Sequence, residues 1–278
     1  MNMRELSVAV VAIAIAATPS FAQSPPGEDT VKALHDAHNP IATRISVPFQ
    51  SNSYFSAGPL EKTTHVLIIQ PVIPIARIAK WNLISRWVTR VVYVPRRSPD
   101  QGSAFGLGNL QPEFYFSPAQ TGKVIWGVGS RLYLPTATSP ELGINKVGGG
   151  PAAAALANSG PWLIGILANN VWAGSGRERV DRMTLSPFVY YHLKDGWYFV
   201  SSPVITSNWV AASSDRWTVP LGGGVGRLFT IDNQAVNARM QGLYNAARPD
   251  FGPHWQLQVQ VQLLFPKHQH EAHDVRSR

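Results

Sequence analysis

Large apolar residues alternate with glutamine along the last regular stretch of the chain, residues 255–265, which reads WQLQVQVQLLF. Successive side chains of a β-strand point to opposite faces, so this stretch predicts a strand with one apolar face and one uncharged, hydrogen-bonding face. The polar face carries Gln256, Gln258, Gln260 and Gln262. We therefore expect the two faces of this strand to meet different surroundings.

About twelve segments of the chain show the same period of two and are predicted to be strands. They span residues 45–55, 65–73, 81–94, 109–117, 124–134, 148–157, 162–172, 183–193, 197–209, 217–229, 236–246 and 255–265. Short strands at this spacing, separated by turn residues, are typical of an all-β barrel or sandwich.

The connections and the tryptophans distinguish these two architectures. Tight connections such as SPAQTG, NSGP, KDG and IDNQ alternate with longer ones such as VPRRSPDQGS, PTATSPELGINKVG and ARPDFGP. Tryptophans stand at strand ends, namely Trp81, Trp162, Trp172, Trp197, Trp209 and Trp255. An up-and-down barrel in the outer membrane has short turns at one end, longer loops at the other and aromatic girdles at both interfaces. The sequence therefore predicts a transmembrane antiparallel up-and-down β-barrel of about 12 strands.

The N-terminus resembles an export signal. MNMRE contains an arginine, LSVAVVAIAIAA is too short an apolar run to span a bilayer, and SFA offers small residues for cleavage. We interpret residues 1–22 as a cleaved signal peptide, in preference to a membrane anchor. The rest divides into a polar segment with one short helix (23–40), the outer-membrane barrel (41–267) and a disordered tail (268–278).

Composition limits the possible partners. Hydrophobic residues make up 45% of the 278 residues and charged residues only 14%, which is roughly half the charged share of an ordinary soluble protein. The net charge of +8 is scattered, without a Lys/Arg-rich run, so a nucleic-acid partner is not expected. Cysteine is absent, which excludes disulfides and thiol catalysis. We expect the partners to be outer-membrane lipid and small solutes.

Charge is restricted to one face of the predicted strands, which in a membrane barrel is the lumen face. The residues expected to line the lumen, beside the four glutamines, are Arg86, Arg90, Glu113, Arg131, Arg182 and Arg239. Two interpretations stay open at this point. The arginines form an electropositive constriction that selects anionic or polarised solutes, or Glu113 and tyrosines such as Tyr115, Tyr133 and Tyr190 pair with them and fill a narrow interior.

Eight ordered segments resemble a Gram-negative family of outer-membrane barrels. They are NPIATRISVPFQSN, IQPVIP, GSAFGLGNLQPEFYFSP, LPTAT, GPWLIGILANNVW, DGWYFVSSPVITSNW, RWTVPLGGGVG and WQLQVQVQLLFPK, from Asn39 to Lys267. This family of transporters is related to the phenol-degradation MetA-pathway proteins, and its members are frequently mislabelled neuromedin U. The resemblance implies a barrel of the porin or transport type with no established substrate and no catalytic residues. The partners expected for this chain are small solutes, anionic or aromatic ones among them. The tail after Lys267 departs from this pattern.

Motifs for catalysis or metal binding are weak, and we expect no catalytic residue, cofactor or metal. GGGVGR (222–227) lacks the ending of a phosphate loop, and HEAH (270–273) falls one residue short of the zinc-protease spacing. His35 and His38 are expected to face solvent. We therefore expect an outer-membrane channel or transporter. A lipase-type enzyme is one alternative, although His192 has lumen parity and a lipase needs a serine and a histidine on the outer wall. A plugged structural barrel is the other.

Four prolines, Pro71, Pro112, Pro187 and Pro203, fall inside predicted strands, where each removes a ladder hydrogen bond. Their recurrence in QPVI, QPEF, SPFV and SPVI predicts a repeated bulge or kink.

Overall fold

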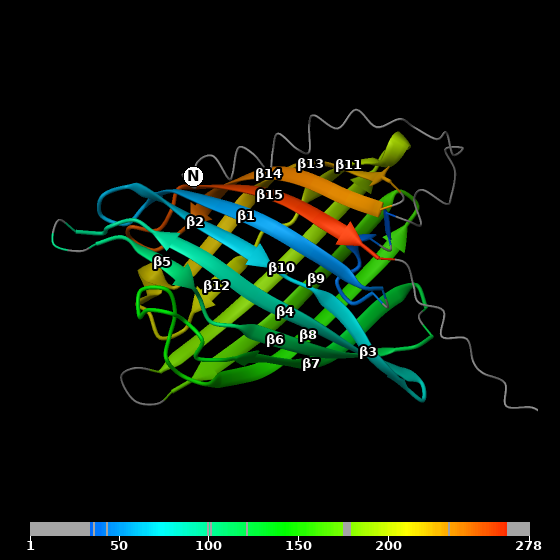
Figure 1. Cartoon of the computed structure of the whole chain (residues 1–278), viewed down its shortest axis with the longest axis horizontal. Coiled ribbons are helices and arrows are strands. Elements are labelled where there is room, and N and C mark those ends of the chain that lie inside the picture. The colour runs from blue at the N-terminus through cyan, green and yellow to red at the C-terminus, as the bar shows by residue number, and fades with distance from the viewer. Residues whose placement is uncertain are drawn as a thin grey trace, which may run out of the picture.

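A computed structural model describes residues 34–265, apart from 36, 43, 99, 101, 121, 175–178 and 233. The expected signal peptide (1–22) and tail (268–278) lie outside these residues. Fifteen strands form one antiparallel sheet that closes on itself as a barrel (Figure 1). No helix among the described residues is long and apolar enough to cross a membrane.

The strands follow one another, and the described residues between them include two short 3-10 turns. Their bounds are β1 (Ser46–Ala57), β2 (Lys62–Ile69), β3 (Val72–Ile78), β4 (Trp81–Val94), β5 (Ala104–Leu107), β6 (Gln111–Pro118), β7 (Val124–Tyr133), β8 (Gly148–Ser159), β9 (Trp162–Ala173), β10 (Val180–His192), η2 (Lys194–Gly196), β11 (Trp197–Ser201), β12 (Ile205–Asn208), η3 (Ser213–Asp215), β13 (Trp217–Ile231), β14 (Gln234–Ala247) and β15 (Trp255–Leu264).

Three pairs of consecutive strands each form one barrel strand that is interrupted along its length. β2 and β3 both pair with β1 and β4, β5 and β6 both pair with β4, and β11 and β12 both pair with β10 and β13. Merging each pair leaves 15 − 3 = 12 barrel strands, and β1 closes the ring against β15. The predicted architecture of about 12 antiparallel strands is thus confirmed.

The two ends of the barrel differ in their connections. Residues 79–80 and 160–161 make tight turns at the end where β1 begins and β15 ends, which we call the short-turn end. The connections 134–147 and 248–254 lie at the opposite, long-loop end. The predicted alternation of short and long connections is therefore present, as expected for a meandering chain in which successive barrel strands run in opposite directions.

Burial alternates along the strands with the period of two. In β15 the four glutamines are buried, whereas Trp255 is 55% exposed. Because a barrel has only an inside and an outside, the glutamines point inward and the apolar parity points outward. Exposed tryptophans gather at both ends: Trp81, Trp162 and Trp197 at the short-turn end, and Trp172, Trp209 and Trp255 at the long-loop end.

The four prolines lie at gaps in the hydrogen-bond ladder. Pro71 and Pro203 stand in the interruptions between β2 and β3 and between β11 and β12. Pro187 of β10 faces the second interruption, because β12 pairs with residues 182–185 and β11 with residues 189–192. Pro112 pairs with Trp87 of β4 but lies outside the ladder between β6 and β7. The missing N–H groups therefore fall where the neighbouring strand offers no regular ladder partner.

The described residues of 34–42 enter the barrel at the short-turn end, and we call them the N-terminal plug. Leu34, His35, Ala37 and His38 are helical. Leu34 and Ile41 belong to one buried cluster with inward residues of β4, β6, β8, β9, β10 and β11. The expectation that His38 faces solvent is wrong, since only 8% of it is exposed. Apolar residues at a helical spacing anchor this segment inside the barrel.

Candidate functional site

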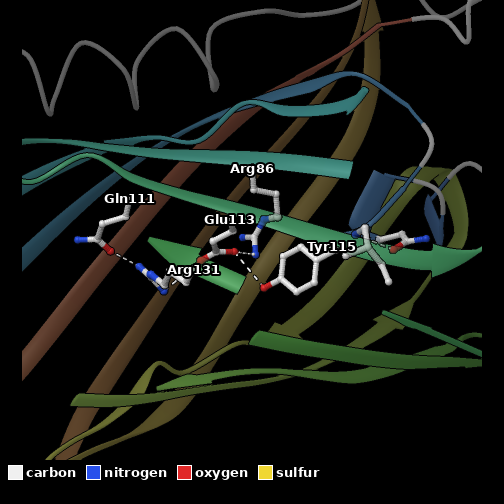
Figure 2. Close-up of polar contacts among 7 residues, drawn as sticks. Arg86, Gln111, Glu113, Tyr115 and Arg131 are labelled. Carbon is white, nitrogen blue, oxygen red and sulfur yellow. Dashed lines mark hydrogen bonds and ion pairs between the residues drawn. The ribbon is translucent and has the colours of Figure 1, made fainter. Parts of the chain in front are cut away.

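The first polar cluster of the interior is a row of charges across three neighbouring strands (Figure 2). Glu113 of β6 lies directly opposite Arg86 of β4 and Arg131 of β7 in the strand register. Its Oε2 is 2.8 Å from Arg86 Nη1, and its Oε1 is 3.0 Å from Arg131 Nη1. One carboxylate therefore bridges two guanidinium groups, which leaves the row with a formal charge of +1.

Two neutral side chains complete this row. Tyr115 Oη donates to Glu113 Oε2 at 3.1 Å, and Arg131 Nη2 donates to Gln111 Oε1. The Glu113 side chain is only 3% exposed, and those of the two arginines about as little, at 11% and 10%. At this depth the charges need one another, because an isolated buried ion is strongly unfavourable.

Arg239 of β14 organises a second cluster that contains no carboxylate among the described residues. Its Nη1 donates to Tyr190 Oη at 2.9 Å and to Ser202 Oγ at 2.8 Å. Its Nη2 donates to Gln260 Oε1 at 2.9 Å and to Gln50 Oε1 at 3.3 Å. Four neutral oxygens from β10, β15, β1 and the β11–β12 interruption thus hold this guanidinium in place.

The N-terminal plug meets the wall beside this second cluster. The His38 ring stacks on Tyr190, with centroids 4.1 Å apart and planes at 13°, and meets Tyr198 edge-on at 4.4 Å. His38 Nδ1 lies 3.2 Å from His192 Nε2. Gln262 Nε2 donates to the carbonyl oxygen of Ala37 at 3.2 Å. The plug is therefore held by both ring contacts and hydrogen bonds.

A hydrogen-bond chain connects this contact to the wall. Tyr198 Oη donates to Asn237 Oδ1 at 2.6 Å, and Asn237 Nδ2 donates to Gln262 Oε1 at 3.1 Å. Gly226 of β13 provides the space for Tyr198, because a Cβ at this glycine would come within 2.3 Å of the tyrosine ring. Small and polar residues of three strands thus fix the ring that the plug contacts.

The remaining residues of the predicted set are spread along the interior. Gln258 accepts from Gln241 Nε2, and Gln256 donates to Asn245 Oδ1 at 2.6 Å. Arg90 lies partly buried on the inward parity of β4. Arg182 lies near the long-loop end of β10 and is exposed. The structure thus brings Arg86, Glu113 and Arg131 together and keeps Arg182 apart at the mouth.

The two interpretations of the lumen arginines, a filled interior and an electropositive constriction, each describe one part of the interior. Glu113 pairs with Arg86 and Arg131, and Tyr190 binds Arg239, as the filled interior requires. Tyr115 donates to Glu113 and also interacts with Arg86. Arg239 nevertheless keeps a charge that no described carboxylate neutralises, as the electropositive interpretation requires.

Sequence reasoning missed several residues of this site. His38, Tyr198, Asn237 and Ser202 take part in it, as does Gln111. Asn237 and Gln111 could have been found from strand parity, because they lie on the face that carries the predicted lumen arginines. His38 and Ser202 lie outside regular strands, so periodicity carries no signal for them.

The lipase alternative requires a serine and a histidine on the outer wall. His192 is buried inside the barrel, as its parity predicts. A different pair meets the requirement: Ser53 Oγ of β1 lies 3.0 Å from His65 Nδ1 of β2. Ser53 pairs in register with Leu257 and His65, on the parity of exposed Phe55 and Trp255. This pair therefore lies on the outer face near the long-loop end.

Solved outer-membrane proteins have a similar fold. An outer membrane channel from Pseudomonas putida F1 matches with a TM-score of 0.59 at 15% identity, over 87% of this chain and 100% of that one. Outer membrane phospholipase A from Escherichia coli gives a TM-score of 0.46 at 14% identity, over 88% and 100%. The CymD monoaromatic hydrocarbon channel gives 0.44 at 11%, over 88% and 94%. The first of these similarities shows a shared barrel fold.

No protein-family model and no curated protein sequence matches the chain.

Proposed function

We propose that this protein is a passive outer-membrane channel for small solutes with a preference for anions. The observation that carries the proposal is the closed barrel whose interior holds arginines and other polar side chains beside an apolar cluster, while its outer face is apolar. A closed barrel satisfies every backbone hydrogen bond within lipid, and its polar lumen offers a path to hydrated solutes. The resemblance to Gram-negative transport barrels supports the same function.

The membrane placement follows from the tryptophans at both ends of the outer face. Aromatic side chains at two levels mark the interfaces of the bilayer with water. Short turns face the periplasm in outer-membrane barrels, so the short-turn end and the N-terminal plug lie on the periplasmic side in this proposal. Export through the expected signal peptide, residues 1–22, is part of the same proposal.

Conductance in planar bilayers tests this function. The chain without residues 1–22, refolded into lipid, should give discrete current steps, with anions carrying more current than cations in a dilute salt gradient. Absence of steps in the refolded barrel, with or without removal of the plug, would contradict the channel function. A folded barrel is recognised independently by its heat-dependent shift in gel mobility.

The Ser53–His65 pair favours a second candidate function, an outer-membrane lipase. A histidine within hydrogen-bond reach of a serine can accept its proton and activate it as a nucleophile. Hydrolysis of a long-chain p-nitrophenyl ester by the detergent-solubilised barrel, lost in Ser53→Ala and in His65→Ala, would establish this activity. Equal hydrolysis by wild type and Ser53→Ala would exclude the pair as its source.

A further inference from the structure

The charge of Arg239 lacks a counter-ion among the described residues. All four oxygens that accept from it are neutral, belonging to Tyr190, Ser202, Gln50 and Gln260. The other cluster is different, because Glu113 neutralises part of the charge of two arginines. A partly buried guanidinium surrounded by neutral dipoles attracts an anion more strongly than one exposed to water, since water screens it less.

An aromatic slot adjoins this guanidinium. Its walls are the rings of Tyr190 and Tyr198, and the His38 imidazole fills it with one face stacked on Tyr190. The ring centroids of Tyr190 and Tyr198 are 5.6 Å apart, with planes inclined at 59°. Because Tyr190 Oη also accepts from Arg239, slot and charge share one residue. A planar ring in the slot can thus place an acidic substituent near the guanidinium.

The present occupant of the slot belongs to the N-terminal plug and not to the wall. His38 precedes β1 in the chain, and the segment that carries it is attached by side-chain contacts instead of a strand ladder. Undocking this segment would empty the slot without breaking the barrel. The His38 imidazole is therefore a planar ring in the position that the ring of an aromatic ligand would occupy.

We propose that Arg239, Tyr190 and Tyr198 form a binding site in the lumen for a planar aromatic carboxylate, with which His38 of the plug competes. This inference rests on the proposed function, because the ligand must enter the lumen. The aromatic ring takes the place of the imidazole, and the carboxylate accepts hydrogen bonds from Arg239. Gln50 and Gln260 can turn their amide groups so that N–H replaces C=O toward the anion.

The site has two halves, the aromatic slot and the Arg239 guanidinium, and together they define the class of ligand. A neutral aromatic molecule stacks on Tyr190 but leaves the charge of Arg239 uncompensated. An aliphatic carboxylate pairs with Arg239 but gains no ring contact. An aromatic cation is repelled by the guanidinium. Only the combination of a flat ring and a negative charge uses both halves, so benzoate is the simplest probe.

Calorimetric titration of the refolded chain without residues 1–22 tests the site at low salt. Benzoate should bind more tightly than acetate or benzyl alcohol. Arg239→Gln should weaken benzoate binding by at least about tenfold, because a charge-assisted hydrogen bond is lost. Tyr190→Leu should remove the difference between benzoate and acetate. His38→Ala should tighten benzoate binding severalfold by removing the competitor, and Arg96→Gln, on an exposed loop, should change nothing.

Equal affinity for benzoate and acetate in the wild type, or unchanged benzoate binding in Arg239→Gln, would overturn the site. Arg239→Lys keeps the charge and should retain part of the affinity, so it serves if Arg239→Gln does not refold. The channel function is judged separately by conductance. Conductance without benzoate binding refutes the inference alone, whereas benzoate binding without conductance refutes the channel and leaves the site.

Discussion

Glu113 bears the only carboxylate that pairs with an arginine inside the described part of the barrel. Replacing it with glutamine keeps the shape of the side chain but leaves Arg86 and Arg131 without a negative partner. Breaking a buried ion pair by removing one member costs about 3–5 kcal/mol. We expect Glu113→Gln to lower the free energy of unfolding by that amount, measured by urea unfolding in lipid vesicles.

The control for this change is a carboxylate outside the lumen. Glu61 is exposed in the turn between β1 and β2, where solvent surrounds its side chain. Glu61→Gln should alter the free energy of unfolding by less than about 0.5 kcal/mol. Similar losses in both variants would mean that the charge row contributes little to stability.

Gly226 and Gly242 form a second contrast at single residues. A Cβ at Gly226 would lie 2.3 Å from Tyr198 Cζ and Oη, whereas one at Gly242 would meet nothing within 4 Å. Gly226→Ala must displace the tyrosine and strain its bond to Asn237, which should cost about 1–3 kcal/mol. Gly242→Ala should remain within about 0.5 kcal/mol of the wild type in the same unfolding assay. A loss in Gly242→Ala as large as in Gly226→Ala would show that strand flexibility, not Tyr198, explains the effect.

At the scale of single residues, the sequence predicts the strand face on which a side chain lies better than it predicts which other side chains it contacts. Strand parity alone assigned Arg86, Arg131 and Glu113 to one face, and they do lie on it. Which of them meet depends on the register between strands, and register is set by turns and bulges that are not contiguous with these residues. The pairing of Arg239 with Tyr190, Ser202 and two glutamines was hidden for the same reason.

Among the elements, the N-terminal plug depends on uncharged histidine. Burial holds the pKa of the His38 imidazole well below its usual value, and repulsion by His192 and Arg239 adds to this, with a smaller effect of His35. Asn237 opposes the shift by hydrogen bonding, and the neutral rings of Tyr190 and Tyr198 complete the surroundings. A docked histidine with a lowered pKa releases its proton, so the undocked plug binds more protons than the docked one.

Docking of the N-terminal plug inside the barrel should therefore keep its full strength above about pH 6.5 and weaken as the pH falls below that value. A nitroxide attached at Ala42→Cys, in a chain without native cysteine, reports the mobility of the plug by electron paramagnetic resonance. We expect greater mobility at pH 5 than at pH 8, and a smaller difference when His38→Gln is added. Equal mobility at both pH values would mean that His38 does not control docking.

Whole elements were predictable where periodicity was long and regular. The predicted strands 81–94 and 255–265 agree with β4 and β15 to within one residue at each end. The effect of the prolines was harder to predict, because a proline within a predicted strand is as compatible with a bulge or kink as with an interruption of the strand. The structure shows interruptions at Pro71 and Pro203 instead. The docking of the plug was not predictable, since its few apolar residues are buried only by distant strands.

At the scale of the molecule, the interior charges do not balance. The predicted lumen set of five arginines and one glutamate gives a formal charge of 5 − 1 = +4. The field of such a set draws anions into a narrow bore, and low salt leaves it weakly screened. Arg90 and Arg182 are the members that form no hydrogen bond or ion pair with other described side chains, so their charge can be removed without breaking a cluster.

We therefore expect the wild-type channel to prefer anions in a dilute salt gradient and the double variant Arg90→Gln/Arg182→Gln to prefer them less, as measured by reversal potentials. The variant Lys80→Gln/Lys123→Gln removes the same net charge from exposed positions at the short-turn end and should keep most of the preference. Near 1 M salt the preference should flatten in all three, because the Debye length falls to about 3 Å. Cation preference in the wild type, or equal changes in both double variants, would show that the lumen arginines do not set the selectivity.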